Sequence, residues 1–228
     1  MQHLPEPEPQ IPESEVEPLV RRFNALYCRA PRRTWANTYW LGTRTLKCPL
    51  DLWMYQEILF RKRPDVIIET GTHSGGSAHF LAFICDLVDA GRVLSIDIKK
   101  IGDPPEHDRI TYIRGSSIAP ETLDTVRDAI EPGESAMVIL DSMHQRDHVL
   151  QELDAYAPLV STDHYLIVED TNINYWWDNF RNRERFGPGP NEAVQQFLAT
   201  DAGREFRVDE EAEKFFMTFN PGGYLVRG

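Results

Sequence analysis

Cysteine, long apolar runs and positive charge are all scarce in this chain of 228 residues. Its three cysteines include no C-x-x-C pair, which excludes a disulfide scaffold and favours a reducing compartment. No stretch approaches the ~18 apolar residues that a membrane span needs. The first 18 residues hold five prolines and five glutamates and lack the apolar core of a signal peptide. We therefore expect a cytoplasmic protein with an extended N-terminal arm.

Negative charge dominates the composition. Lysine and arginine number 24 against 36 aspartates and glutamates, so the formal net charge is −12. Duplex DNA and anionic membranes attract proteins of net positive charge, so we expect neither nucleic acid nor membrane as a partner. A small anionic substrate is still compatible, because it needs only a local basic pocket. The length favours one domain with a full hydrophobic core.

Short apolar runs alternate with segments of helical spacing from Pro64 onward, which is typical of βαβ units and a parallel sheet. The tail differs, because KFFMTFN and GYLVRG flank the turn Pro221-Gly222-Gly223 and predict a hairpin. The sequence thus predicts an α/β fold, a Rossmann-like, doubly wound, mostly parallel seven-stranded sheet with a C-terminal antiparallel hairpin. Expected strands cover 66–69, 93–97, 110–115, 137–141, 164–170 and 204–209, and expected helices 14–29, 52–61, 78–90, 120–130, 145–159 and 191–198.

Two regions of different character are expected. Residues 1–50 form a helical and loop extension that serves as an arm, a lid or an oligomerisation segment, and 51–228 form the main domain. Asp51 looks like the N-cap of the first helix of that domain. The aromatic residues around Trp35–Trp40 suggest a homo-oligomer in which one chain helps to close the site of its neighbour.

The residues after each expected strand come first in a search for function, because ligands of open α/β sheets bind at the carboxyl ends of the strands. The first strand ends in Glu69, followed by the glycine-rich loop TGTHSGGS, which matches neither G-x-G-x-x-G nor a Walker A loop. Asp97 ends the second strand, 26 residues after Gly71, where an acid can accept hydrogen bonds from ribose hydroxyls. Ser117 follows the third strand and is placed to flank an adenine. Together these residues predict a site for a nucleoside-containing cofactor; the alternative is that both acids simply cap loops.

Carboxylates also follow the fourth and fifth expected strands. Asp141 ends the fourth, and Glu169 and Asp170 end the fifth. If these strands are neighbours, three carboxylates converge, and their mutual repulsion calls for a cation. Oxygen ligands favour Mg²⁺, Mn²⁺ or Ca²⁺. Loop capping is the alternative role.

His144, three residues after Asp141, is a candidate general base; a structural role is the alternative. None of the seven histidines is followed two residues later by Asp or Glu, which counts against the His-x-Asp/Glu pair of a non-haem iron oxygenase.

Five blocks occur in an order that resembles the historically named cephalosporin hydroxylase family. They are RPDVIIETGTHSGGSA, LSIDIK, VILDSMH, YLIVEDTNIN and GPGPNEAVQQFL, and the resemblance runs from about Trp35 to the end of the chain. Members of the family look like class I S-adenosylmethionine-dependent methyltransferases, including rhamnosyl O-methyltransferases of natural-product biosynthesis. The resemblance therefore implies that 51–228 is a methyltransferase domain.

The resemblance also implies roles at matching positions. It places the methionine part of S-adenosylmethionine against Glu69 and Gly71, the ribose against Asp97 and the adenine side against Ser117. Cofactor binding is also expected of Thr72, Ser77 and Asp141. It gives Mg²⁺ to Asp141, Glu169 and Asp170. His144 stands where catechol-type enzymes place a lysine base, and with Asp141 it is expected to be catalytic.

One stretch departs from the family pattern. YWWDNFRNRERF precedes GPGP and forms an aromatic and basic loop beside the expected metal. Aromatic rings stack on sugar faces and arginines pair with phosphate. We expect Tyr175, Trp176, Trp177 and Arg181 to bind the substrate; the alternative is that the loop packs on another subunit or on the N-terminal segment.

The function implied is S-adenosylmethionine- and Mg²⁺-dependent O-methylation of a small-molecule acceptor, a sugar nucleotide or glycosylated natural product. Three alternatives are kept: methylation of a catechol-like hydroxyl, a hydroxylase of antibiotic biosynthesis, and a cofactor-binding accessory protein.

Overall fold

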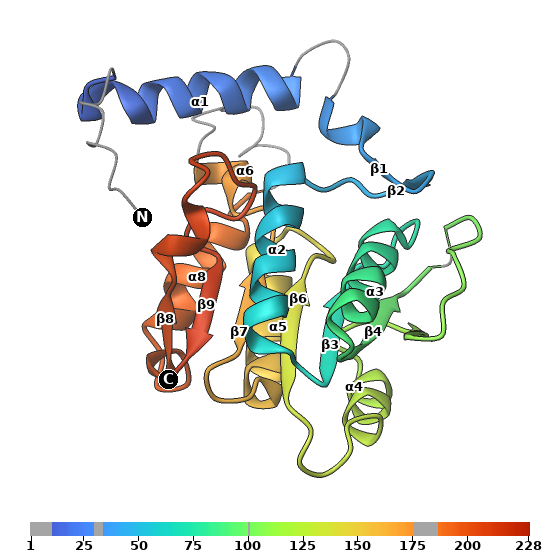
Figure 1. The fold of residues 1–228 in the computed structure, drawn as a ribbon. Coiled ribbons are helices and arrows are strands. Elements are labelled where there is room, and N and C mark those ends of the chain that lie inside the picture. The colour runs from blue at the N-terminus through green and yellow to red at the C-terminus, as the bar shows by residue number, and fades with distance from the viewer. Residues whose placement is uncertain (1–10, 30–33, 100, 176–186) are drawn as a thin grey trace, which may run out of the picture.

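The computed structural model describes residues 11–29, 34–99, 101–175 and 187–228. A seven-stranded sheet in the order β5-β4-β3-β6-β7-β9-β8 has helices on both faces (Figure 1). The strands β5, β4, β3, β6 and β7 are parallel to one another, whereas β9 is antiparallel to both β7 and β8. The expected α/β class and strand number are confirmed. The strands are β3 (Val66–Thr70), β4 (Arg92–Asp97), β5 (Ile110–Arg114), β6 (Ala136–Leu140), β7 (Tyr165–Val168), β8 (Phe206–Val208) and β9 (Tyr224–Arg227).

Two apolar layers hold the helices to the sheet. Strands buried on both faces read as continuous apolar runs, and successive side chains alternate between the faces. Ile67 therefore packs in the layer under α2 and α3, whereas Ile68 packs in the layer under α4, α5 and α8. The helices are α2 (Pro49–Lys62), α3 (Gly76–Val88), α4 (Pro120–Asp128), α5 (Arg146–Tyr156), α6 (Asn172–Tyr175) and α8 (Pro190–Leu198), with short 3₁₀ turns at Ala157–Leu159, Gly203–Glu205 and Glu210–Glu213.

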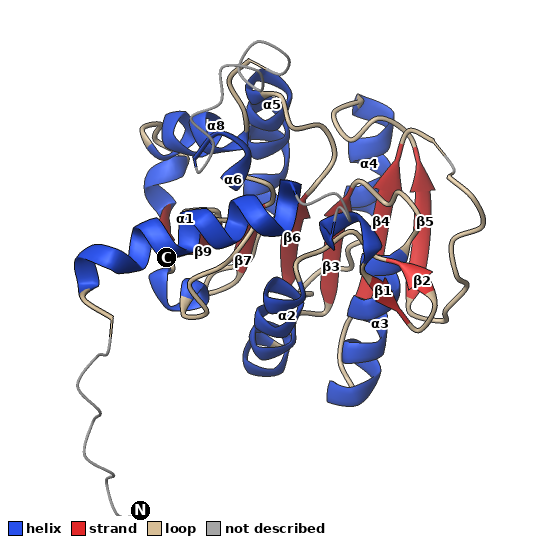
Figure 2. Cartoon of the chain, turned by 90° about the horizontal axis from the view of Figure 1, so that it is seen from above, coloured by secondary structure: helices blue, strands red, loops and turns tan. Residues whose placement is uncertain are grey.

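The N-terminal region lies over one end of the sheet. Helix α1 (Glu13–Arg29) crosses above the carboxyl ends of the parallel strands (Figure 2), and its Tyr27 ring lies 5.9 Å from that of Phe219. A 3₁₀ turn (Thr34–Asn37) and a small hairpin of β1 (Tyr39–Trp40) and β2 (Thr43–Arg44) follow. None of the described helices has both the length and the apolar composition for crossing a membrane.

Two details of the sequence analysis are wrong. KFFMTFN forms no strand: β9 pairs with β7 and β8, and Met217 and Phe219 instead pack with Cys48 near the start of α2. Asp51 is not an N-cap, because α2 begins at Pro49 after the N-cap residue Cys48. Both errors have one cause, since α2 and the segment before β9 pack against each other.

A buried carboxylate joins these two segments. Asp51 is 2% exposed, and it accepts hydrogen bonds from the Phe219 amide at 2.8 Å and the Tyr224 hydroxyl at 3.0 Å. Burial raises the pKa of Asp51 to about 6, although these hydrogen bonds and the charge of Lys47 oppose the shift. The pKa in the unfolded chain is about 4. The folded protein therefore binds this proton more tightly than the unfolded chain does.

Asp51→Asn tests this linkage. The contribution of Asp51 to folding is greatest below pH 4 and is lost as the pH rises through 6, because the folded state must then bury an anion. Two pKa units correspond to about 3 kcal/mol. We expect the difference in unfolding free energy between wild type and Asp51→Asn to fall by about that amount between pH 4 and pH 7, measured by urea unfolding. Exposed Asp124→Asn is the control, and a pH-independent difference would contradict the assignment.

Candidate functional site

The glycine-rich loop after β3 is wedged between the ends of two other strands. The Gly71 amide donates to the Ile96 carbonyl of β4 at 2.8 Å. Gly71 has φ +89°, and a Cβ on it would lie 1.9 Å from the Asp141 carbonyl oxygen, just after β6. Only a residue without a side chain fits here, so the loop passes directly over the switch point at β3, where β4 lies on one side and β6 on the other.

Glu69 supports the loop from below. Its side chain is fully buried, and Oε2 accepts a hydrogen bond from the Ser95 hydroxyl at 2.9 Å, which in turn lies 2.7 Å from the Thr72 hydroxyl. Oε1 has no hydrogen-bond partner among the described residues. Burial raises the pKa of Glu69. The structure thus places Glu69 under the site, with Thr72 between it and the cavity.

Asp97 is fixed by two backbone amides. Oδ2 accepts from the His73 amide at 2.8 Å, and Oδ1 accepts from the Lys99 amide at 2.9 Å. Each oxygen keeps lone pairs for further donors. Asp97 also lines a cavity with Ser117, so the two residues expected at the nucleoside end of a cofactor share one wall.

A larger cavity of about 300 Å³ brings seven of the predicted site residues onto one wall. Its wall contains the glycine loop, the end of β4 and the ends of β6 and β7. Trp35 and Phe219 contribute aromatic surface from the N-terminal and C-terminal segments. The predicted site residues on this wall are Gly71, Thr72, Ser77, Asp97, Asp141, His144 and Asp170.

Three side chains on this wall form a potential metal site. One ligand atom from each of Asp141, His144 and Asp170 lies within 4.8 Å of the others. His144 Nε2 is 3.4 Å from an oxygen of Asp170. The two carboxylates suit a hard divalent cation such as Mg²⁺ or Mn²⁺, and the imidazole of His144 lies beside them.

Glu169 is not part of this group. Its Oε1 accepts hydrogen bonds from Lys47 Nζ at 2.6 Å and from the Tyr55 hydroxyl at 2.7 Å, and the side chain is 3% exposed. Of the three carboxylates that the sequence analysis assigned to a metal, the structure brings two together and binds the third to a lysine.

Lys47 is a site residue that the sequence analysis missed. It precedes α2, is 2% exposed, and also donates to Asp141 Oδ2. Burial lowers the pKa of the Lys47 ammonium, but the carboxylates of Asp141 and Glu169 raise it by more, so the pKa is above the ordinary lysine value. Its partners are 94 and 122 residues away in sequence, so no local pattern indicates the contact.

His148 was also missed. Its Nε2 lies 3.1 Å from the Ser142 hydroxyl and 3.3 Å from that of Ser117. Ser142 donates to the buried Glu152 at 2.7 Å. The only signal in the sequence is the spacing of His148 and Glu152, which places both on one face of α5.

Most of the loop that is expected to bind the substrate lies outside the described residues. Trp176, Trp177 and Arg181 lie outside the described residues, and Tyr175 is described only as the last backbone position of α6.

Comparisons with known proteins agree in sequence and in fold. A family model described as rhamnosyl O-methyltransferase/CmcI matches residues 32–228. A rhamnosyl O-methyltransferase of Mycobacterium leprae is 36% identical over 203 residues, which cover 85% of this chain and 84% of that protein. One from Mycobacterium bovis (strain BCG / Pasteur 1173P2) is 34% identical over 200 residues, covering 85% and 79%.

Solved structures share the fold at lower identity. A CmcI structure with Mg and SAM has a TM-score of 0.64 and 21% identity, and the match covers 100% of this chain and 89% of that one. MycE, a methyltransferase of the mycinamycin biosynthetic pathway in complex with Mg, SAH and mycinamycin VI, has a TM-score of 0.55 and 16% identity, with 77% and 47% covered.

Gly71→Ala tests the close contact between the glycine loop and β6. We expect it to lower the unfolding free energy by at least about 2 kcal/mol more than Gly133→Ala does. Gly133 is a matched control, because its φ is +94° but a Cβ there would meet nothing within 4 Å. The difference, measured by urea unfolding, isolates the contact with Asp141 from the cost of positive φ. Equal losses would contradict the packing described.

Proposed function

The chain belongs to the rhamnosyl O-methyltransferase/CmcI family, and from this premise we propose that it transfers the methyl group of S-adenosylmethionine to a sugar hydroxyl. The acceptor that we propose is a sugar nucleotide or a glycosylated small molecule. One observation carries the proposal: a single cavity wall includes both Asp97 and the group of Asp141, His144 and Asp170. A nucleoside cofactor and a cation can therefore meet over the same acceptor.

The described residues fit the cofactor. Asp97 offers two positioned carboxylate oxygens to ribose hydroxyls, and Ser117 lies beside it for the adenine. Gly71, Thr72 and Ser77 line the same cavity wall, and we propose that the methionine end binds there. We assign Glu69 a supporting role under the loop. When bound, S-adenosylmethionine supplies an activated methyl group on a sulfonium.

The described residues also fit a divalent cation. We propose that Asp141 and Asp170 hold it, since their carboxylates are close together in a half-buried site and need positive charge. A bound Mg²⁺ or Mn²⁺ would lower the pKa of an acceptor hydroxyl. Glu169 is not assigned as a ligand, because its Oε1 is held by Lys47 and Tyr55.

We propose that His144 takes the proton of the acceptor. With S-adenosylmethionine bound, the acceptor oxygen would take the methyl group as the carbon–sulfur bond breaks, and the imidazole of His144 would accept the hydroxyl proton. Asp170, 3.4 Å from Nε2, stabilises the resulting imidazolium. Alignment of the two reactants in one cavity supplies much of the remaining rate.

The aromatic residues over the cavity support a sugar acceptor. Trp35 lies on the cavity wall and is 37% exposed, so its ring is available to stack on a sugar face. We propose that Tyr175, Trp176, Trp177 and Arg181 complete the acceptor site. Residues 34–47, which belong to the N-terminal extension, would then act as its lid. The expected homo-oligomer stays a prediction.

A hydroxylase of the non-haem iron type is less consistent with the donors. The group on the wall contains one imidazole and two carboxylates among the described residues, whereas a facial triad needs two imidazoles and one carboxylate.

Asp170→Asn tests the proposed chemistry. We expect methyl transfer from labelled S-adenosylmethionine to rhamnosides or sugar nucleotides to fall on the order of a hundredfold or more, because a cation ligand is lost. Affinity for S-adenosylhomocysteine should change far less, since Asp170 does not line the cavity that Asp97 and Ser117 share. Asp201→Asn, at an exposed position, is the control. Transfer to catechols but to no sugar would contradict the proposed acceptor.

A further inference from the structure

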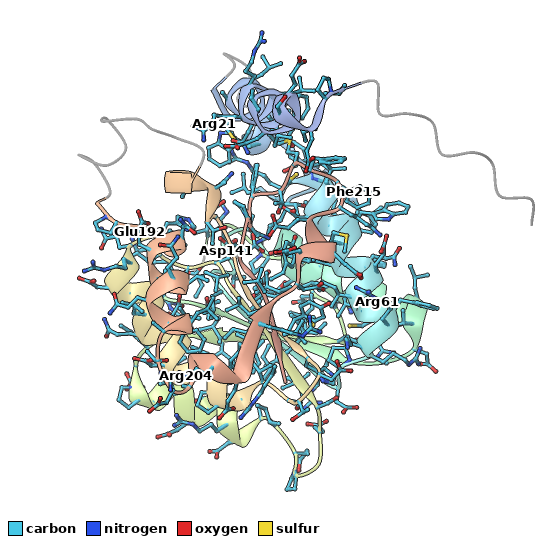
Figure 3. All side chains as sticks on the ribbon, turned by 90° about the vertical axis from the view of Figure 1, so that its left-hand side faces the viewer. Arg21, Arg61, Asp141, Glu192, Arg204 and Phe215 are labelled. Atoms are coloured by element: carbon cyan, nitrogen blue, oxygen red, sulfur yellow. The ribbon has the colours of Figure 1, made fainter. Side chains whose placement is uncertain are left out.

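Lys47 is a buried cation within a cluster of acids. Its ammonium contacts Asp141 Oδ2 and lies 2.6 Å from Glu169 Oε1. Asp141, labelled in Figure 3, lies below α1 in that view, and its side chain is half-buried. Burying an ammonium is costly unless it is paired, and these two carboxylates provide the pairing.

The backbone around Lys47 is held in place, so its side chain has little freedom to move away from these carboxylates. Cys48 is 1% exposed, and Pro49 opens α2 directly after it, so the chain around Lys47 is anchored on both the helix and the core. The lysine stem is packed as well, because the whole residue is 2% exposed. Lys47 is therefore a fixed part of the site and not a solvated surface charge.

The charges at this edge of the sheet do not balance. Glu69, Asp141, Glu169 and Asp170 carry four carboxylates, and among the described residues Lys47 is the one lysine or arginine whose side chain is paired with any of them. A divalent cation therefore has a place even when Lys47 is present. However, Asp141 belongs both to the lysine pair and to the group with His144 and Asp170. One carboxylate thus has to serve two positive charges, which repel each other.

We propose that Lys47 is an internal competitor of the divalent cation, one that holds Asp141 and Glu169 in the metal-free protein and thereby weakens cation binding. The inference rests on the proposed function, because it assumes the cation site assigned above. Its value to the protein is that the carboxylate cluster stays compatible with folding in the absence of metal.

The test is a calorimetric titration of Mn²⁺ into the full chain, with melting temperatures in EDTA as a second readout. We expect Lys47→Met to bind Mn²⁺ at least tenfold more tightly than wild type, to melt at a lower temperature in EDTA, and to gain more from Mn²⁺. Lys47→Arg keeps the positive charge, so it should bind Mn²⁺ more weakly than Lys47→Met does. Lys62→Met is the control, because Lys62 pairs with Asp163 outside this cluster.

A second comparison covers the case in which Lys47→Met fails to fold without metal. Glu169→Gln and the double variant Lys47→Met/Glu169→Gln differ by the same lysine but leave no unpaired charge at position 169. The double variant should bind Mn²⁺ at least tenfold more tightly than Glu169→Gln. A lysine that only held the fold together would show the opposite sign, since its loss would disorder the ligands and weaken binding.

The outcomes separate the inference from the proposed function. If wild type binds Mn²⁺ and removal of Lys47 leaves the affinity equal or weaker, the competition is disproved and the proposed cation site stands. If no variant binds Mn²⁺, both fall. Asp170→Asn should lose binding in either background.

Discussion

Repulsion among carboxylates at one edge of the sheet is the constraint on which the site depends. Parallel strands bring their carboxyl ends together, and here those ends carry Glu69, Asp141, Glu169 and Asp170. Several hydrogen bonds and ion pairs reduce this repulsion. Glu69 is buried on Ser95, Glu169 is held by Lys47 and Tyr55, and Asp141 is shared with Lys47. Asp141 and Asp170 are left facing His144 on the cavity wall, where a divalent cation would complete the balance.

Hydrogen bonds of the buried polar side chains also link distant segments of the chain. Asn220 donates to the Tyr55 hydroxyl at 3.1 Å, and Tyr224 donates to Asp51. With the Glu169 contact of Tyr55, these bonds connect the start of α2, the segment before β9 and the end of β7. These buried polar groups are therefore connected to the site. A change in packing near the C-terminal end of the chain would alter the position of Glu169.

Features that depend on neighbouring residues in the sequence could be predicted, whereas contacts between distant residues could not. Continuous apolar runs such as VIIE and MVIL place the strands, and the strand ends then place Asp97, Asp141 and Asp170 on one edge without further information. KFFMTFN was wrongly predicted as a strand, because its apolar residues pack near the start of α2 instead of extending the sheet. The apolar pattern of one segment does not indicate which other segment it packs against. Lys47 and the binding of Glu169 needed the folded chain, because the contact joins residues 122 apart.

The central claim is that this edge of the sheet binds a nucleoside cofactor and a divalent cation together. The most direct measurement is a calorimetric titration of S-adenosylhomocysteine into the purified protein, with and without Mg²⁺. The account predicts saturable one-to-one binding in wild type that is lost in Asp97→Ala. Absence of binding in both conditions would contradict it and would remove the cofactor roles of Gly71, Asp97 and Ser117.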